Sequence, residues 1–583
     1  MKIKISDYIV NKLEEIGVTT IFGYQGGNIS HLIDSIGNSG KIEFVETYHE
    51  QAAAFAANSY AQAGEKIGVA IASSGPGAIN LLNGIANAFC DSIPCIYFIG
   101  DINTTAKKNS GSLRQNSFQE INILPMVEPI VKYATSIKKP EEIVTELEKA
   151  IHIATTGRKG PIVINLPHDI QRSFISVDGY GEIKSGEEIE KKECVVSVLK
   201  TVDVLKQSRR PVILIGGGMK DNECRILLKK LLDKFPVPVV CSLLGIDVLN
   251  HSSIFYRGVV GGYGNRVANL CIKYADCILI LGNRIDDRQI TSLNIEELGE
   301  KRIIHVDIDK NEIGNKLKED ISIVCDVHEF LKKLIPALPE LSFKEWLCLT
   351  SKMKNDFKQI DGSFESEDTS VALMSSLHPN DFINDLSKEI EANYTLDVGN
   401  NQMHAMQSLY VNGETRVYSS GGLGAMGYSL PASIGTCYSD KRKKTICITG
   451  DGGLQMNIQE LQTIIFHNLP VNIVLLNNHA LGMIYDLQKK MFPDRYIGTI
   501  EGYSTPNFEK VSKAYGFKYF RVNCMSDYNE AINLLKRETE VFVELNMTIP
   551  VAMKPGPGNG IFAQNPQLNN EYIEQLEMEI NRI

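Results

Sequence analysis

Lys444–Met483, with the sequence KTICITGDGGLQMNIQELQTIIFHNLPVNIVLLNNHALGM, is the most informative stretch of the chain. Lys444–Thr449 and Val471–Leu476 are short runs of β-branched and apolar residues, which are typical of buried strands. Between them, Asn457–Asn468 carries apolar side chains at helical spacing. The stretch therefore predicts a strand, a helix and a second parallel strand, with Gly450–Gly453 (GDGG) in a glycine turn after the first strand.

The residues of this turn point to a diphosphate and a metal ion. Glycines let the backbone approach a phosphate closely, and the N–H groups at the start of the following helix favour its negative charge. Asp451 and Asn478, 27 residues later, supply side-chain oxygens, and the backbone carbonyl of Ala480 completes a ligand set that suits Mg²⁺. A P-loop would need Gly-Lys-Ser/Thr in the turn and a Rossmann fingerprint would need Gly-x-Gly-x-x-Gly, and the turn has neither.

Gly-Asp-Gly-Gly followed at this distance by Asn-Asn resembles the cofactor motif of the thiamine-diphosphate-dependent enzymes. Within that superfamily the chain resembles the large catalytic subunit of acetolactate synthase (acetohydroxyacid synthase) from about Lys4 to Pro550. The resemblance implies a transferase of aldehyde or ketone residues in branched-chain amino acid biosynthesis, with thiamine diphosphate and Mg²⁺ as cofactors. It also implies a homodimer or homotetramer and raises the question of a separate regulatory subunit.

The composition agrees with a multidomain enzyme that acts on small molecules. The chain has 583 residues, more than one hydrophobic core usually supports, with 43% hydrophobic and 22% charged residues. Its net charge of −10 gives no support to nucleic-acid binding or to membrane-surface binding. The N-terminal sequence lacks a signal peptide's apolar core, and no stretch has the length of a membrane helix, so we expect a cytoplasmic protein.

Strand-like runs alternate with helical patterns throughout, which predicts an α/β fold of three consecutive domains, each a mostly parallel sheet flanked by helices. The resemblance implies a pyrimidine-binding domain at residues 1–178, a central Rossmann-like domain at 190–342, and a diphosphate-binding domain with a C-terminal tail at 372–583. Two polar stretches, Gly179–Cys194 and Lys352–Ser370, are predicted to be exposed linkers.

Glu50 is the candidate for the carboxyl group that thiamine diphosphate needs beside its aminopyrimidine ring. It follows the strand-like Ile42–Val45 and precedes an alanine-rich helical stretch, a position where a lone glutamate can also be a helix cap. His-Glu followed by Ala-x-x-x-Ala resembles the family's glutamate motif. The resemblance implies that this carboxyl reaches a cofactor held by another subunit, so that a dimer is the smallest active unit.

The resemblance also implies a set of cofactor contacts. Asn400, Asn401 and Gln402 would bond diphosphate oxygens, and Met426 would hold the cofactor in a bent conformation, although a methionine is also common core packing. The complete expected set of cofactor contacts is Gly27, Glu50, Pro76, Asn80, Asn400, Asn401, Gln402, Gly424, Met426, Gly450, Asp451, Gly452, Gly453, Asn478, Ala480, Leu481, Gly482 and Met483.

On the substrate side, the resemblance places Phe118 and Gln119 of Ser117–Glu120 toward the substrate, with His168 near the entrance. Arg288 could grip a carboxylate through two N–H bonds, or could form a structural pair with Asp286 or Asp287. The expected catalytic set is thus Glu50, Phe118, Gln119, Arg288 and His168.

The chain departs from the family at several substrate positions. Leu487 replaces a tryptophan that favours a larger second oxoacid, His168 replaces a lysine, Gln25 replaces a proline and Asp101 stands where glutamine is usual. Loss of a flat apolar wall weakens discrimination between neighbouring oxoacids. These differences indicate a rebuilt acceptor pocket. They leave open, as an alternative to a second oxoacid, a polar or bulkier acceptor such as a sugar-derived aldehyde.

The leading hypothesis is therefore a carboligase that decarboxylates a 2-oxoacid, pyruvate above all, and adds the two-carbon unit to a second carbonyl compound. A 2-oxoacid decarboxylase or C–C lyase is the alternative enzyme class. A non-catalytic cofactor-binding protein is disfavoured because Glu50, Asp451 and Asn478 are all present. The glycine segments of the central domain are open to two interpretations: an FAD site without redox duty, or turns after strands.

Overall fold

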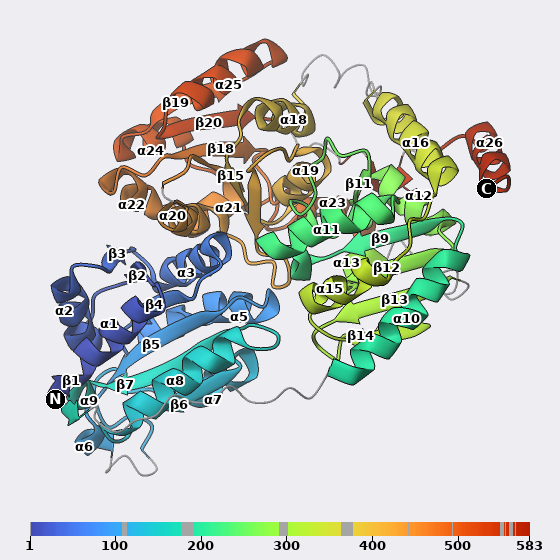
Figure 1. Ribbon diagram of the computed structural model, residues 1–583. Helices are drawn as coiled ribbons and strands as arrows, with labels where there is room; N and C mark the ends of the chain where they lie inside the picture. The colour runs from blue at the N-terminus through green and yellow to red at the C-terminus, as the bar shows by residue number, and fades with distance from the viewer. Residues whose placement is uncertain are drawn as a thin grey trace.

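The computed structural model describes residues 2–107, 113–176, 191–290, 301–362, 377–440, 442–492, 494–547, 553, 555–558, 564–565 and 567–583. Three six-stranded sheets, each made of parallel strands, form the cores of three α/β domains. Figure 1 shows the first domain in blue to cyan, the central domain in green and yellow, and most of the third domain in orange and red. The predicted fold class is confirmed.

The first and third sheets have the same topology. The order is β3-β2-β4-β5-β7-β6 in the first and β16-β15-β17-β18-β20-β19 in the third, so both follow 2-1-3-4-6-5 within their own domain. The strands of the first sheet are β2 (Thr20–Gly23), β3 (Glu43–Glu46), β4 (Gly68–Ala72), β5 (Cys95–Asp101), β6 (Tyr133–Ser136) and β7 (Ile162–Pro167). Those of the third are β15 (Asn393–Leu396), β16 (Arg416–Ser419), β17 (Thr445–Gly450), β18 (Val471–Asn477), β19 (Lys518–Val522) and β20 (Val541–Asn546).

The central sheet follows a different order, β11-β10-β9-β12-β13-β14, or 3-2-1-4-5-6 within the domain. The order reverses between β9 and β12, and this switch point leaves a crevice at the carboxyl ends of the two strands. The strands are β9 (Pro211–Ile215), β10 (Val239–Cys241), β11 (Tyr256–Val259), β12 (Cys277–Leu281), β13 (Arg302–Asp307) and β14 (Ile321–Val324). Helices α10 (Lys191–Gln207), α11 (Asn222–Lys234), α12 (Arg266–Tyr274) and α15 (Val327–Ala337) flank it.

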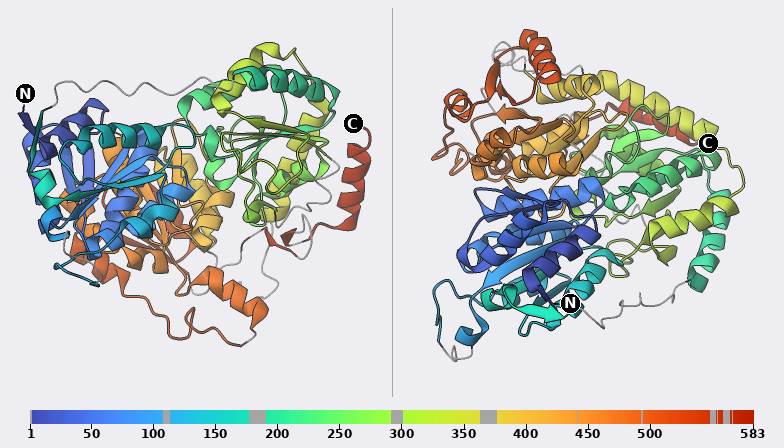
Figure 2. Two further views of the ribbon diagram at one scale, coloured as in Figure 1. Left: turned by 90° about the horizontal axis from the view of Figure 1, so that it is seen from below. Right: turned by 60° about the vertical axis from the view of Figure 1, so that its left-hand side comes forward.

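The first and third domains meet through two helices that occupy equivalent places in their folds. Helices α3 (Glu50–Gly64) and α20 (Ser429–Ser439) each connect the second and third strands of their sheets and lie side by side. A Cβ on Gly435 would stand 1.9 Å from the carbonyl oxygen of Ala56, so the glycine permits this close approach. Figure 2 shows the two domains stacked, with the central domain beside them.

The stretch Lys444–Met483 folds nearly as its sequence predicts. Strands β17 and β18 and helix α22 (Glu460–Phe466) lie at the expected positions. The glycines differ from the expectation, because helix α21 (Asp451–Met456) begins directly at the strand end, with Gly450 as its N-cap. A Cβ on Gly453 would stand 2.6 Å from Asp397 Oδ1, so the second half of the motif serves close helix packing and not a turn.

The predicted linker Lys352–Ser370 is only partly described, and its described part is not a linker. It is the second half of helix α16 (Lys344–Gly362), whose Met353 and Phe357 are buried. The C-terminal helix α26 (Asn570–Ile580) packs along α16, where Tyr572 Oη bonds Asp356 at 3.1 Å. The first predicted linker lies largely outside the described residues.

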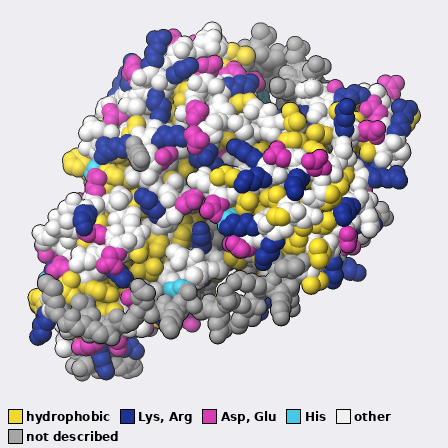
Figure 3. Space-filling model, in the orientation of Figure 1, with side chains coloured by type: hydrophobic (Ala, Val, Ile, Leu, Met, Phe, Trp, Pro, Cys, Tyr) yellow, Lys and Arg dark blue, Asp and Glu magenta, His cyan; other side chains and the backbone are white. Residues whose placement is uncertain are grey.

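The surface is mixed in character. On the face shown in Figure 3, acidic and basic side chains are interspersed among apolar areas. Among the described residues, no helix is both long enough and apolar enough to cross a membrane.

Candidate active site

Glu50 and the residues around it lie at the carboxyl ends of strands in the first sheet. Glu50 is the first residue of α3, and the ring of its N-cap His49 accepts a hydrogen bond from the Gln51 N–H at 3.1 Å. Asn80, the last residue of α4 (Pro76–Asn80), donates to Glu50 Oε2 at 2.9 Å. A Cβ on Gly77 would stand 2.8 Å from Glu50 Oε1. The candidate carboxylate, at the start of α3, is thus held against α4 by Gly77 and Asn80.

The segment Ser117–Glu120, expected to face the substrate, lies against the loop that precedes α4. Gln119 adopts a φ of 61°, and its Cβ lies 3.0 Å from where a Cβ on Gly75 would stand, directly before Pro76. Phe118 is 86% exposed. Around Gly27, no atom lies within 4 Å of a Cβ position, which leaves open space above its backbone. The structure therefore brings Gln119 against Gly75, the residue before Pro76, and it leaves Phe118 on the surface of the single chain.

His168 begins the short helix α9 (His168–Gln171) after β7, and its ring lies 4.6 Å from that of His31. Burial, and then the nearby His168, lower the pKa of His31. Asp101 is 1% exposed, and its carboxylate accepts hydrogen bonds from the Asn165 amide and from the Ile102 N–H. The residue that departs from the family at this position is held within the protein.

Asp451 has the environment that a metal ligand needs. It is 3% exposed, and its Oδ2 has no hydrogen-bond partner in the described part of the chain, although Oδ1 accepts from the Gly452 N–H at 3.0 Å. Burial raises the pKa of Asp451 to about 6. An unpaired carboxylate oxygen in a buried site costs free energy unless a cation or donor compensates it. The residue therefore fits Mg²⁺.

The other expected ligands lie beside Asp451. Asn478 is nearly buried, and its Oδ1 accepts the Ala480 N–H at 3.2 Å. A Cβ on Gly482 would stand 2.6 Å from Asn400 Nδ2 and 2.7 Å from Asn478 Nδ2, so these two amides share one small space. The side-chain oxygens of Asn400 and Asn401 are buried and unpaired among the described residues. Polar groups left without partners mark a place prepared for a polar ligand.

Two apolar side chains and a tyrosine hydroxyl close one side of this space. A Cβ on Gly452 would stand 2.6 Å from Leu481 Cδ2, 3.3 Å from Met426 Cε and 3.3 Å from Tyr503 Oη. Met426 thus lies against the glycines of the motif. Tyr503 was not identified from the sequence, because it lies 51 residues beyond Gly452 without any motif around it.

Of the other expected cofactor contacts, Gln402 and Met483 pack within the protein, and Gly424 is exposed. Gln402 is buried, and its amide donates to Ser419 Oγ at 2.6 Å and to the Ser420 carbonyl at 3.3 Å. Both of its N–H donors are therefore used within the protein. Met483 packs partly against the large apolar core. Gly424 lies in an exposed loop with a φ of 70°.

Arg288 forms the structural pair that the sequence left open. Its guanidinium lies 3.5 Å from Asp286 and donates to the carbonyl oxygen of Gly421, while 47% of the side chain stays exposed. Arg288 thus lies where the central domain meets the loop that carries Met426, and its exposed part leaves donors free for a ligand.

Asp397, at the end of β15, organises the loop that carries Met426. Its carboxylate accepts the Gly427 N–H at 2.9 Å, the Ser429 N–H at 3.1 Å and the Ser429 hydroxyl at 2.7 Å. Burial raises the pKa of Asp397, and these bonds oppose the shift. Its position directly after a strand, two residues before Gly399, is the signal in the sequence that points to such a role.

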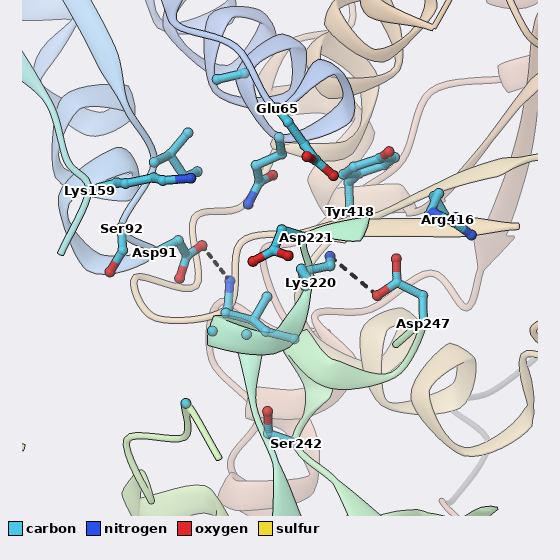
Figure 4. A pocket seen from close by; sticks show the side chains of 18 of the residues that line it. Glu65, Asp91, Ser92, Lys159, Lys220, Asp221, Ser242, Asp247, Arg416 and Tyr418 are labelled. Atoms are coloured by element: carbon cyan, nitrogen blue, oxygen red, sulfur yellow. Dashed lines mark hydrogen bonds and ion pairs between the residues drawn. The ribbon is translucent and has the colours of Figure 1, made fainter. Parts of the chain in front are cut away.

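A cavity of about 760 Å³ lies between the three domains. It opens at the switch point of the central sheet, where Gly216–Gly218 follow β9 and Gly282 follows β12. A Cβ on Gly216 would stand 2.1 Å from the Gly282 carbonyl oxygen, so the two loops touch. Figure 4 shows Lys220 pointing toward Asp247, whose carboxylate lies 3.7 Å from it. Cationic groups lining this cavity include Arg158, Lys220, Arg225 and Arg284.

Comparisons with known proteins agree with this arrangement. Residues 3–126, 198–334 and 397–545 match the N-terminal TPP binding domain, the central domain and the C-terminal TPP binding domain of thiamine pyrophosphate enzymes. The chain is 35% identical over 549 residues to the probable acetolactate synthase large subunit of Methanocaldococcus jannaschii, covering 91% of this chain and 89% of that protein. It is 31% identical over 559 residues to the acetolactate synthase isozyme 3 large subunit of Escherichia coli, covering 93% and 94%. The chain belongs to the acetolactate synthase large-subunit family of thiamine-diphosphate-dependent enzymes.

Proposed function

We propose that the protein is a thiamine-diphosphate-dependent carboligase that decarboxylates pyruvate and joins the remaining two-carbon unit to a second carbonyl compound. With pyruvate as acceptor, two pyruvate molecules give one acetolactate and one CO₂. The observation that carries the proposal is the buried, unpaired Oδ2 of Asp451 beside Asn478 and the unpaired amide oxygens of Asn400 and Asn401. Its family membership and the retained Glu50 support it.

Thiamine diphosphate and Mg²⁺ are assigned to the carboxyl edge of the third sheet. Asp451, Asn478 and the carbonyl oxygen of Ala480 would hold Mg²⁺, because hard oxygen ligands are what this ion prefers. Asn400 and Asn401 would contact the diphosphate. Gln402 is left out of this set, because its donors are used by Ser419 and Ser420. When bound, thiamine diphosphate would supply a nucleophilic carbon and an electron sink for the decarboxylation of the oxoacid.

The protein's own groups handle protons and orientation. Glu50 exchanges a proton with the aminopyrimidine ring, and Asn80 fixes the oxygen that is not used. Gln119 and Arg288 orient the substrate carboxylates, and His168 lies on the approach. The apolar Met426 and Leu481 exclude water, which favours loss of a charged carboxylate as neutral CO₂.

The proposal includes a second copy of the chain. Among the ten residues of helix α23 (Gly482–Met491), which starts at the cofactor site, only Gly482 is buried. Ile484, Leu487 and Met491 are 47%, 50% and 58% exposed. An exposed apolar helix face at a binding site marks an interface, so we assign it to a homodimer or to a homotetramer built from such dimers. Size-exclusion chromatography with light scattering would measure the oligomeric state. A fully active monomer would exclude the proposed interface.

FAD is assigned to the cavity between the domains. The 3-2-1-4-5-6 strand order and the touching glycine loops at the switch point suit a dinucleotide diphosphate. The lining of the cavity carries both basic and acidic side chains, and Arg158, Lys220 and Arg284 are among the basic ones. Heat denaturation of purified protein should release a compound with the flavin absorption band. Colourless protein that binds no added FAD would contradict the assignment.

The chain is proposed to act as a large, catalytic subunit, since its relatives carry that name. The first experiment is an assay of the purified chain alone with thiamine diphosphate, Mg²⁺ and pyruvate, with products identified by mass. Acetolactate supports the proposal and shows that a smaller subunit is not required. Acetaldehyde, or pyruvate loss that needs another carbonyl compound, would assign a different reaction or acceptor.

The matched variants for this assay are Glu50→Gln and Glu141→Gln, the latter an exposed glutamate of the same domain. Glu50→Gln should abolish turnover and keep cofactor binding, whereas Glu141→Gln should behave as the unaltered protein. Addition of a chelator should stop turnover, and added Mg²⁺ should restore it.

A further inference from the structure

Glu460 is a buried carboxylate that the cofactor site does not use. It is the first residue of α22 in the third domain and is 0% exposed. Its Oε1 accepts the Tyr48 N–H at 2.9 Å, and its Oε2 accepts the Thr463 hydroxyl at 2.8 Å. Tyr48 lies 412 residues earlier in the chain, so this bond crosses from the third domain into the first.

The bond reaches the start of the helix that carries Glu50. Tyr48 comes two residues before Glu50, and His49 between them is the N-cap of α3. The first turn of a helix has N–H groups without intrahelical partners and a partial positive charge, and a carboxylate at this end is favourable. Burial raises the pKa of Glu460 to about 7, and hydrogen bonds from the Thr463 side chain and the Tyr48 backbone oppose the shift. The surroundings therefore supply the donors that a buried carboxylate needs.

The remaining contacts of α3 with the third domain lie further along the helix. Ser59 Oγ donates to the Ala432 carbonyl at 2.7 Å, and Ser439 Oγ donates to the Tyr60 carbonyl at 2.8 Å. These bonds hold the second half of α3 against α20. Glu460 holds the other end, where a small displacement would move the Glu50 carboxylate relative to Asn80 and to the bound ring.

We propose that Glu460 is a positioning residue that fixes Tyr48 and the start of α3, and thereby sets where the Glu50 carboxylate meets the aminopyrimidine ring. The inference rests on the proposed catalytic role of Glu50. A displacement of about 1 Å in a reacting group can cost about 100-fold in rate, so loss of this anchor should appear in proton transfer before it appears in binding.

The test compares Glu460→Ala, Glu460→Gln and Ser439→Ala in the full-length protein loaded with thiamine diphosphate and Mg²⁺. Two quantities are measured: exchange of the thiazolium carbon-bound hydrogen for deuterium, and kcat and KM for pyruvate. Glu460→Ala should slow both exchange and kcat by about 10-fold or more, with KM and cofactor affinity nearly unchanged. Glu460→Gln should restore most of the rate, because its amide oxygen still accepts the Tyr48 N–H. Ser439→Ala removes another interdomain bond to α3 and should leave exchange unchanged.

Should Glu460→Ala not yield folded protein, Glu460→Asp serves instead. It keeps the charge but shortens the side chain by one methylene, so it should slow exchange although the domain retains an acid at this place. Unchanged exchange in the Ala or Asp variant would overturn the inference, as would an equal loss in Ser439→Ala.

The Glu50→Gln variant distinguishes a failure of the proposed role of Glu50 from a failure of the positioning role of Glu460. Exchange that persists in Glu50→Gln would overturn the proposed role of Glu50 itself. Exchange that is lost in Glu50→Gln but unaffected in the Glu460 variants would overturn the positioning role alone.

Discussion

Asn80 donates a hydrogen bond of 2.9 Å to Oε2 of Glu50, and the other carboxylate oxygen lies over Gly77 of the same short helix. The two residues are 30 positions apart and follow different strands of the first sheet. One oxygen of the carboxylate is thus hydrogen-bonded to Asn80, while the other lies beside the backbone of Gly77.

Replacing Asn80 should therefore impair turnover. Asn80→Ala removes the donor and should lower kcat about 10-fold, and Asn80→Asp should lower it further because two carboxylates would then face each other. Steady-state kinetics with pyruvate would measure both effects. Turnover equal to that of the unaltered protein in both variants would show that Glu50 does not need this bond.

The contact between α3 and α20 should not tolerate a methyl group. In Gly435→Ala the new Cβ would stand 1.9 Å from the Ala56 carbonyl oxygen, so the helices must separate, and we expect a loss of about 3 kcal/mol in the free energy of unfolding. Gly37→Ala is the matched control, because Gly37 is also helical and has no atom within 4 Å of its Cβ position. Chemical denaturation would compare them, and equal stabilities would contradict the packing argument.

Arg158 joins the first domain to the central domain. Its guanidinium contacts Asp309 at 2.9 Å and Glu312 at 2.6 Å, and 28% of the side chain is exposed. Arg158→Ala should lower the free energy of unfolding by about 1–2 kcal/mol, with a smaller effect at high salt. Lys513→Ala, which breaks an exposed pair within one helix, should change stability by less than about 0.5 kcal/mol. Thermal denaturation at two salt concentrations would measure both effects. Equal losses in the two variants, or a loss in Arg158→Ala that does not depend on salt, would contradict the prediction.

Leu487 should influence the choice of acceptor. Its side chain is 50% exposed on α23, close to the cofactor site. Leu487→Trp adds a flat apolar wall and should change the ratio of kcat/KM values for two competing acceptors by about 10-fold. Lys489→Trp, on the same helix but turned to another side, is the control. Competition assays analysed by mass would show an unchanged ratio if Leu487 does not line the acceptor pocket.

Glu460 should make stability depend on pH. Burial raises its pKa from an ordinary value of 4.5 to about 7 in the folded protein, so between these values the folded state keeps a proton that the unfolded state has lost. Stability should thus fall as pH rises from about 4.5 to about 7, and the contribution of this group is on the order of 3 kcal/mol. Glu460→Gln cannot lose a proton and should show a flatter profile. Identical profiles of denaturation midpoint against pH would refute this.

The local elements of the site could be predicted from the sequence. Strands β17 and β18, and the assignment of Asp451 and Asn478 to one site, follow from periodicity and spacing within a contiguous stretch. The helical conformation of Gly452 and Gly453 could not, because it depends on Asp397 and Leu481 packing where a Cβ would otherwise stand. The helix α16 could not be predicted either. Its sequence is largely polar, and Met353 and Phe357 are buried only because other parts of the fold pack against them.

The sequence by itself determined the fold class, the cofactor motif and the candidates Glu50, Asp451 and Asn478, because strand and helix periods and motif spacings are properties of neighbouring residues. Only the tertiary structure revealed that the first and third sheets share one topology, that their equivalent helices meet at Gly435, and that Glu460 reaches Tyr48 across 412 residues. These relationships depend on how separate surfaces pack and on where a buried charge finds its donors. Surface packing and the donors of a buried charge involve residues that are far apart in the chain, so no single stretch of sequence predicts them.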